Sequence, residues 1–334
     1  MKKKLIIILK NIVCSLILPV VAFIIFYYIA RSKGNSSYGD FYTWRAILTN
    51  AAMPICIGSV IGLNLKNGRM DLSSGANLAL TAIIACTLTQ AVHGNGFVLL
   101  GLCIIFGVLF SILTATIYIS LKIPMVITAI GMVLFYESLT KVVNGGNGSN
   151  IVSTSNLNYW GAVPYSYVLA IIALLIYYII TKYSIFGYES DAITNNQNVA
   201  VNVGIKEKRT VLAIFIFSGI ILGLGATIYA SNNIIDQQSN LASVGIVYSN
   251  FIPIIVGLYL ARYSNDAVGI FIGSITIAII RYSLNLVGFS SLENIVIGVF
   301  IIIFSIFTNN QDAIIKKFKN RKLNLQRNEI NISN

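Results

Sequence analysis

Apolar stretches of about 18 or more residues recur along this chain from one end to the other. An α-helix needs about 20 such residues to cross the hydrocarbon core of a bilayer, so each stretch can form a transmembrane helix. Only 10% of the 334 residues are charged, whereas an ordinary soluble domain has about 25%. The sequence therefore predicts an all-α integral membrane protein.

Hydropathy and helix-breaking residues together predict about ten membrane-spanning helices. They lie at 12–31, 45–64, 74–92, 97–120, 126–143, 165–182, 210–230, 242–262, 267–286 and 291–308. Because ten is an even number, the two termini share one side of the membrane. No soluble domain fits between the spans, and we expect a basic N-terminus (1–11), one transmembrane domain (12–308) and a basic tail (309–334).

Lysine and arginine fall mostly on one side of this predicted topology. With the N-terminus in the cytoplasm, eighteen of the 23 lie in cytoplasmic segments, four lie on the outer side, and Arg281 lies within a span. This is the positive-inside distribution that membrane insertion and anionic lipid produce. It explains the net charge of +12 without a nucleic-acid partner, and it places both termini in the cytoplasm.

No pattern typical of a catalytic or metal site is present in the sequence. There is no GxxxxGK[ST] phosphate loop, no nucleophile and base at catalytic spacing, and no CxxC among the four cysteines. His93 is the single histidine, and no second histidine completes a ligand set. We therefore expect no enzyme activity, no metal and no cofactor, so that any ATP hydrolysis occurs on a partner.

The stretch NGRMDLSSG (67–75) places an aspartate between two predicted spans. Its glycines permit backbone bends, and Asp71 and Ser73 can accept hydrogen bonds from the free N–H groups that begin the next helix. We expect Asp71 to be the N-cap, with contact between Asp71 and substrate as the alternative. The predicted hinge residues are Gly68, Asp71, Leu72, Ser73 and Gly75.

The long predicted cytoplasmic loop contains a short amphipathic segment. Ala192, Val199, Ala200 and Val203 share a face at helical spacing, and Gly204 is a natural stop. The pattern alone leaves two interpretations open: a solvated connector on lipid headgroups, or a coupling helix that fits a groove on a separate motor protein. For a coupling segment at 187–209, the predicted contact residues are Asp191, Ala192, Thr194, Asn195, Asn198, Val199, Val203 and Gly204.

Polar and charged residues inside the predicted spans are the candidates for a translocation path. A charge in the membrane is costly, so Glu137 and Arg281 are expected to face the interior, to line a path, or to pair with each other. The amides and aromatic rings can contact a transported solute, but they can equally serve helix packing. The predicted path residues are Asn50, Asn77, Phe135, Tyr136, Glu137, Arg281 and Asn285.

Four stretches, taken in order, resemble one known family. NGRMDLSSG resembles the signature Gly-Gly-Ile-Asp-Leu-Ser-x-Gly, IPMVITAIGMVLFYESLTKVVNGG resembles the family's Ile-Pro helix that ends in a glycine pair, and residues 187–219 resemble its coupling segment. The stretch LNLVGFSSLENIVIGVFIIIF resembles its last two helices. Together they cover most of residues 60–308 and resemble the ribose-type sugar permeases of bacterial ABC importers, in a wider group with branched-chain amino-acid permeases.

The resemblance implies a type II-like importer permease of ten helices in the bacterial cytoplasmic membrane. Such a permease pairs with itself or with a sister permease, and it works with two cytoplasmic ATPase subunits and an extracytoplasmic solute-binding protein. It also implies inward movement of a ribose-like sugar by ATP-driven alternating access. Nucleosides and furanosyl signal molecules stay open as substrates, and an ion-coupled secondary transporter is the alternative from another class.

This sequence departs from the family pattern at several positions. Arg69 stands in place of the second glycine of the signature, and Met70 stands in place of isoleucine. Glu137 occupies a position where a basic residue is common. The sequence VGLYLARYSNDAVG replaces a glycine-rich turn after the eighth span. A degenerate half of a heterodimeric permease is therefore a further alternative.

Overall fold

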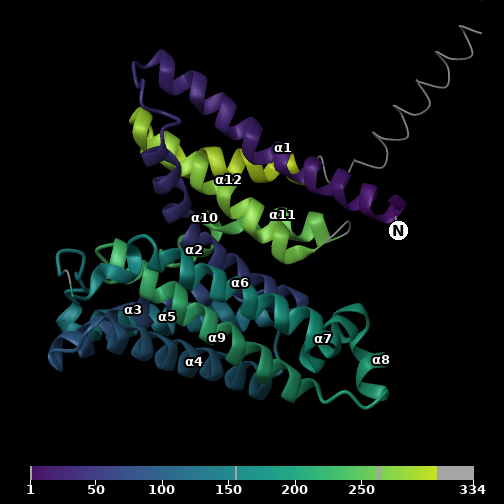
Figure 1. Cartoon of the computed structure of the whole chain (residues 1–334). Coiled ribbons are helices and arrows are strands. Elements are labelled where there is room, and N and C mark those ends of the chain that lie inside the picture. Colours follow the sequence, from purple (N-terminus) through teal and green to yellow (C-terminus); the bar gives the residue numbers. More distant parts are fainter. Residues whose placement is uncertain (1, 155, 262–264, 307–334) are drawn as a thin grey trace, which may run out of the picture. The chain divides into compact units, whose positions relative to one another are not determined.

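The computed structural model describes residues 2–154, 156–261 and 265–306, and the regular elements in these ranges are helices (Figure 1). The chain divides into two units, 1–290 and 291–334, and each is considered by itself. The predicted tail at 309–334 lies outside the described residues. The elements are α1 (Lys2–Ser32), α2 (Phe41–Lys66), α3 (Ser74–Ala91), α4 (Gly96–Leu121), α5 (Met125–Val142), η1 (Val143–Gly146), η2 (Asn158–Gly161), α6 (Tyr165–Tyr183), α7 (Ile185–Asn195), α8 (Gln197–Asn202), α9 (Glu207–Asn232), α10 (Val244–Ser249), α11 (Phe251–Ala261), α12 (Asp266–Val287) and η3 (Ser290–Leu292).

Seven of the described helices are long and apolar enough to cross a membrane, namely α2, α3, α4, α6, α9, α12 and the helix that begins with α5. This confirms the all-helical membrane prediction, but not ten continuous spans. The predicted span 242–262 is divided between α10 and α11. Within the described residues, the first and last predicted spans contain only shorter apolar helices, Leu18–Ser32 and Ser290–Ile306. The side of the membrane on which the termini lie stays a prediction.

Burial separates the central helices of the 1–290 unit from the peripheral ones. In α2, α3, α9 and α12, 72% of the most apolar window is buried inside the protein. In α4, in α6 and in the helix that begins with α5, the buried share is 33% to 39%. The second group therefore leaves more apolar surface free to contact lipid or another protein chain.

Glycine residues allow α4 and α9 to pack closely as an antiparallel pair (Figure 1). A Cβ atom added at Gly107 would lie 2.8 Å from the carbonyl oxygen of Gly219, and one added at Gly223 would lie 2.5 Å from the Cα of Ile104. Larger residues would therefore force the two backbones apart, as at other glycine-rich interfaces of membrane helices. The pairing brings the C-terminal end of α4 to the start of α9.

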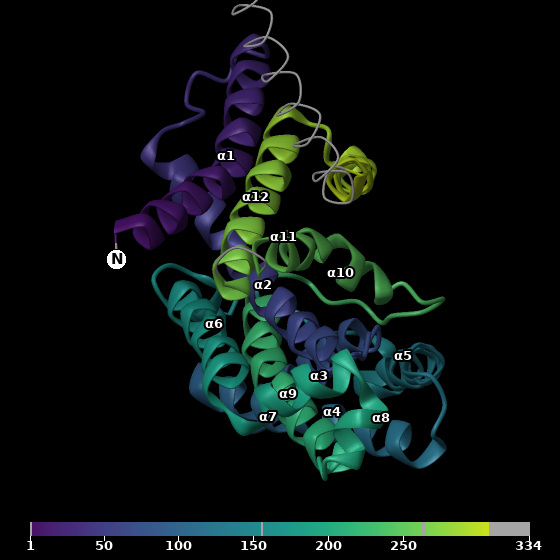
Figure 2. The same cartoon turned by 90° about the vertical axis from the view of Figure 1, so that its right-hand side faces the viewer.

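The break between α10 and α11 falls at Asn250, and Figure 2 shows the two helices as successive segments before α12. Proline has no backbone N–H, so Pro253 cannot donate the helical hydrogen bond to the carbonyl of Ser249, four residues earlier. Arg281 of α12 supplies a donor instead, with its Nη2 atom 2.8 Å from that carbonyl oxygen. The expected continuous span is thus replaced by a short helix, α10, whose last turn depends on another segment.

Candidate functional site

The turn between α2 and α3 (residues 67–73) is ordered by Asp71. This side chain is only 5% exposed, and its Oδ1 accepts hydrogen bonds from the N–H of Ser73 at 2.8 Å and from its hydroxyl at 2.6 Å. Burial raises the pKa of the Asp71 carboxyl, and these two hydrogen bonds oppose the rise. The N-cap position of α3 is Ser73, so the expected N-cap position of Asp71 is wrong, although the Asp71 side chain does accept from a free N–H as expected and the Ser73 side chain does not. Asp71 instead closes the turn just before the cap.

Two glycines of the motif allow other segments to approach closely. Gly68 has φ +71, in the left-handed region that favours glycine, and a Cβ there would lie 3.3 Å from the hydroxyl of Thr194 in α7. A Cβ at Gly75 would lie 2.2 Å from the carbonyl oxygen of Ser243, just before α10. The motif thus contacts the predicted coupling segment at one end and the broken helix at the other.

Arg69, which replaces a glycine of the family signature, is buried in the 67–73 turn with 4% exposure. Its Nη2 atom lies 2.5 Å from Oε1 of Glu207, the first residue of α9. Its Nε donates to the hydroxyl of Tyr118 in α4 at 3.1 Å, and the guanidinium carbon lies 5.3 Å from the centre of that ring. Nη1 donates to the carbonyl oxygen of Asn67. One side chain therefore joins the turn to the ends of α4 and α9.

The end of α2 is fixed by a second set of contacts. The Nζ of Lys66 lies 2.5 Å from Oδ2 of Asp266, the first residue of α12, and the hydroxyl of Tyr177 in α6 donates to the same oxygen at 2.6 Å. The hydroxyl of Thr194 donates to the carbonyl oxygen of Lys66 at 2.6 Å. The predicted coupling segment is therefore attached directly to the residue that ends α2.

The predicted short helix over 191–203 is in fact two helices, α7 and α8, separated at Asn196. Asn196 is extended (φ −161), and its side chain accepts from the N–H of Val199 at 3.2 Å. The break changes the helical phase, so the predicted shared apolar face does not form: Ala200 is buried, whereas Val199 is 55% and Val203 79% exposed. Of the predicted contact residues, Ala192 is half-buried, while Asp191, Thr194, Asn195, Asn198, Val199, Val203 and Gly204 are exposed.

The start of α9 is connected to both parts of this segment. The side-chain amide of Gln197, the first residue of α8, donates to Oε1 of Glu207 at 2.9 Å. The hydroxyl of Thr210 donates to Oε2 of Glu189 in α7 at 2.5 Å. Glu207 thus contacts both α8 and Arg69, so a displacement of α8 would also displace the 67–73 turn.

Glu137 and Arg281 hold opposite ends of α10, and the suggested pairing between them is wrong. Glu137 is 3% exposed, and its carboxylate accepts from the N–H of Leu241 at 2.9 Å and from the N–H and hydroxyl of Ser243 at 2.9 and 2.6 Å. Arg281 donates to the carbonyl of Ser249 and, at 3.1 Å, to Oδ1 of Asn250. A negative group at the start of a helix and a positive group at its end both match the helix dipole.

The other predicted path residues do not gather into one site. The hydroxyl of Tyr136 donates to the carbonyl of Phe110 at 2.6 Å, and the amide of Asn77 donates to the hydroxyl of Ser111 at 3.1 Å, so both join α4 to neighbouring helices. Phe135, Asn50 and Asn285 are exposed. The translocation path stays a prediction.

The sequence patterns do not indicate that five further residues belong to this site: Lys66, Tyr118, Gln197, Glu207 and Asp266. One available signal was the pair of unusual charges: Arg69 is a basic residue in a glycine motif, and Glu207 is an acidic residue in the basic run KEKR. Two departures of opposite sign at the same predicted membrane face are an argument for contact. No comparable signal marks Lys66, because its charge also fits the positive-inside pattern.

Comparisons with known proteins agree with the four-stretch resemblance. The chain is 22% identical over 272 residues to the ribose import permease protein RbsC of Escherichia coli (strain K12), covering 78% of this chain and 82% of that protein. It is 24% identical over 284 residues to the galactose/methyl galactoside import permease protein MglC of Haemophilus influenzae, covering 78% and 84%. The match to the galactofuranose transporter permease protein YtfT of Escherichia coli (strain K12), 23% identical over 219 residues, covers 63% of this chain and 62% of that protein. No solved structure matches the chain.

A family profile also matches this chain. It extends over residues 45–305 and describes the permease component of the branched-chain amino acid transport system. That range contains the 67–73 turn, the segment 187–209 and both charges that hold α10. Because the match covers well over half of the chain, this protein belongs to the family of branched-chain amino acid transport system permease components.

Proposed function

We propose that this chain is the membrane-spanning permease subunit of a bacterial sugar ABC importer and moves a ribose-like monosaccharide inward. Family membership supports the permease role, and the relatives named for ribose, galactose and galactofuranose support a sugar. The partners in this proposal are a second permease, either identical or a sister chain, cytoplasmic ATPase subunits and an extracytoplasmic solute-binding protein. The chain itself performs no hydrolysis.

The observation that carries this proposal is the connection between segment 187–209 and the motif turn. Thr194 donates to the last carbonyl of α2, and Glu207 pairs with Arg69 inside the turn. A coupling segment must transmit movement into the membrane helices, and a solvated connector needs no such contacts. The exposed side chains Asp191, Asn195 and Val199 leave a surface on which an ATPase can dock.

The same contacts suggest how movement reaches the centre of the protein. Movement of α7 and α8 displaces the turn through Thr194 and Arg69, and the turn begins α3. The α3 backbone at Gly75 lies directly against Ser243, which Glu137 also holds. In this proposal ATP-driven displacement of the coupling segment therefore changes the position of α10, which gives alternating access.

A double charge change tests the coupling assignment. Asp191→Lys combined with Asn195→Lys places two cations on the proposed docking surface and should abolish solute-stimulated ATP hydrolysis by the assembled complex, with normal expression. Asp40→Lys is a control for added positive charge, because Asp40 is exposed and lies before the first residue of α2, about 39 Å from Lys66 along this helix of 26 residues. Unchanged stimulation in the double variant would contradict the assignment.

Uptake that survives ATP depletion and stops with an ionophore would instead show a secondary transporter.

A further inference from the structure

A cavity of about 490 Å³ lies between the end of α4, the start of α5 and the starts of α8 and α9. Its apolar wall includes Ile119, Ile123 and Val211, and its charged residues are Lys122, Lys208 and Glu207. Cavities of about 300–1,000 Å³ suit small molecules or single headgroups. The proposed transport steps use one lining residue, Glu207, through its pair with Arg69, but they place no ligand in the cavity.

The cavity has a net positive charge. Lys122 and Lys208 are exposed, and within the described residues neither ammonium group forms an ion pair. Glu207 does not cancel them, because its carboxylate is paired with Arg69 at 2.5 Å. Two free ammonium groups at one cavity favour an anion that can contact both, such as a phosphate.

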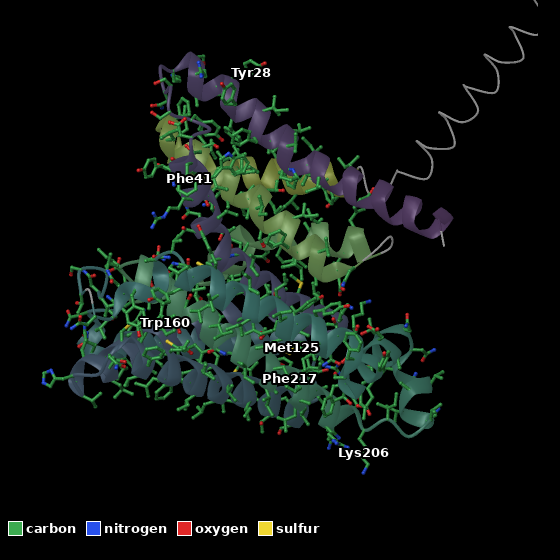
Figure 3. The ribbon with its side chains drawn as sticks, viewed as in Figure 1. Tyr28, Phe41, Met125, Trp160, Lys206 and Phe217 are labelled. Carbon is green, nitrogen blue, oxygen red and sulfur yellow. The ribbon has the colours of Figure 1, made fainter. Side chains whose placement is uncertain are left out.

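The depth of the cavity matches the headgroup layer of a bilayer. Lys122 directly follows the apolar helix α4, and Lys208 lies in the first turn of α9, three residues before its apolar part begins at Val211. Ammonium groups at the ends of apolar spans lie at the membrane surface. Leu121, beside Lys122 in sequence, and Ile127 in the first turn of α5 are 55% and 58% exposed, so they offer apolar surface to an acyl chain. Figure 3 shows Lys206 projecting at this same end of the 1–290 unit.

We propose that this cavity binds the phosphate of an anionic phospholipid from the cytoplasmic leaflet. The headgroup lies between Lys122 and Lys208, and the part of the acyl chain nearest the headgroup lies against Ile119 and Ile123. Because α8 and α9 both line the cavity, the bound lipid contacts the coupling segment through Gln197. The proposal goes beyond the transport function and does not depend on the sugar carried.

The test uses the full chain in phosphatidylcholine nanodiscs that contain increasing phosphatidylglycerol, with retained lipid counted by native mass spectrometry. The variant Lys122→Gln/Lys208→Gln should weaken phosphatidylglycerol retention roughly thirtyfold, the factor expected from losing two lysine–lipid contacts. Lys122→Arg/Lys208→Arg keeps both charges and should retain the lipid. The control variant Lys33→Gln/Lys141→Gln changes two exposed lysines outside the cavity and should behave as the unsubstituted chain.

Several results would overturn the proposal. Equal retention of phosphatidylglycerol by the unsubstituted chain and the double glutamine variant would show that the cavity lysines do not bind it. Displacement of the lipid by an equal concentration of soluble glycerol phosphate would assign the site to a free phosphate compound. Displacement by the ATPase subunit would assign it to a protein partner. Matched melting temperatures for the glutamine and arginine variants exclude misfolding as the cause of lost binding.

Discussion

The ion pair between Arg69 and Glu207 gives a quantitative test of how the motif turn is attached to the coupling segment. Arg69→Met removes the guanidinium but keeps most of the buried stem, so the main loss is electrostatic. Exposed ion pairs contribute about 0.2–1 kcal/mol, whereas removing one partner of a buried pair costs about 3–5 kcal/mol. Arg69 is 4% exposed and Glu207 is 27% exposed, so we expect an intermediate loss of about 2–3 kcal/mol in the free energy of unfolding.

A double-mutant cycle isolates the pair from the other contacts of Arg69. The single variants are Arg69→Met and Glu207→Gln, and unfolding is followed in mixed micelles as the denaturing detergent is increased. The glutamine can still accept from Gln197, so the change at Glu207 removes mainly the charge. We expect the double variant to be more stable than the sum of the single losses by about 1–2 kcal/mol, typical of residues in direct contact.

The control cycle pairs Glu207→Gln with Arg209→Met. Arg209 lies over the ring of Phe186 and forms no ion pair with Glu207 among the described contacts. Residues two apart on a helix do not face each other, and Glu207 and Arg209 share no described side-chain contact, so we expect the two substitutions to add within about 0.5 kcal/mol. An equally additive Arg69 cycle would refute the energetic coupling of Arg69 to Glu207, because the pair would then contribute nothing beyond its separate residues.

Two further substitutions test the attachment of α10. Glu137→Gln replaces one carboxylate oxygen by an amide donor that faces backbone N–H groups. The free energy of local opening over 241–249 should fall by about 2–3 kcal/mol, so amide hydrogen exchange there should become faster. An unchanged exchange rate contradicts the assignment. Gly75→Ala should lower the free energy of unfolding by about 1–3 kcal/mol because its Cβ meets the Ser243 carbonyl. Gly131→Ala is its matched control, since nothing lies within 4 Å of a Cβ there, and a helical alanine should be neutral or stabilising by up to about 1 kcal/mol. Equal effects of the two alanines on thermal unfolding would disprove the close contact.

Length and hydropathy predicted most of the helices because a membrane span is defined by a single local property. They did not predict the break at Asn250, since the deciding feature is the missing N–H of Pro253 together with a donor from α12. In a membrane, such a proline can be tolerated inside a span when another segment bonds to the freed carbonyl. The composition of the segment alone does not reveal that partner.

The site was predicted less well than the helices, for a geometric reason. Depth along a span can be estimated from sequence, but the direction in which a side chain points cannot. A pairing of Glu137 with Arg281 was therefore one of the expectations, although the two residues hold opposite ends of one short helix. Arg69 was recognised only as a departure from a motif, because its partner Glu207 is distant in sequence.

Coupling of this chain to a cytoplasmic ATPase requires that the segment 187–209 face the cytoplasm. A chain whose natural cysteines have been replaced by alanine is given either Asn195→Cys or Asn233→Cys and is labelled with a membrane-impermeant maleimide. Asn195 lies before α9 and Asn233 follows its last residue, and both are exposed. We expect Cys labelling at position 195 only in inside-out vesicles and at position 233 only in intact cells. Labelling of position 195 from outside the cell would contradict the coupling of this chain to a cytoplasmic ATPase.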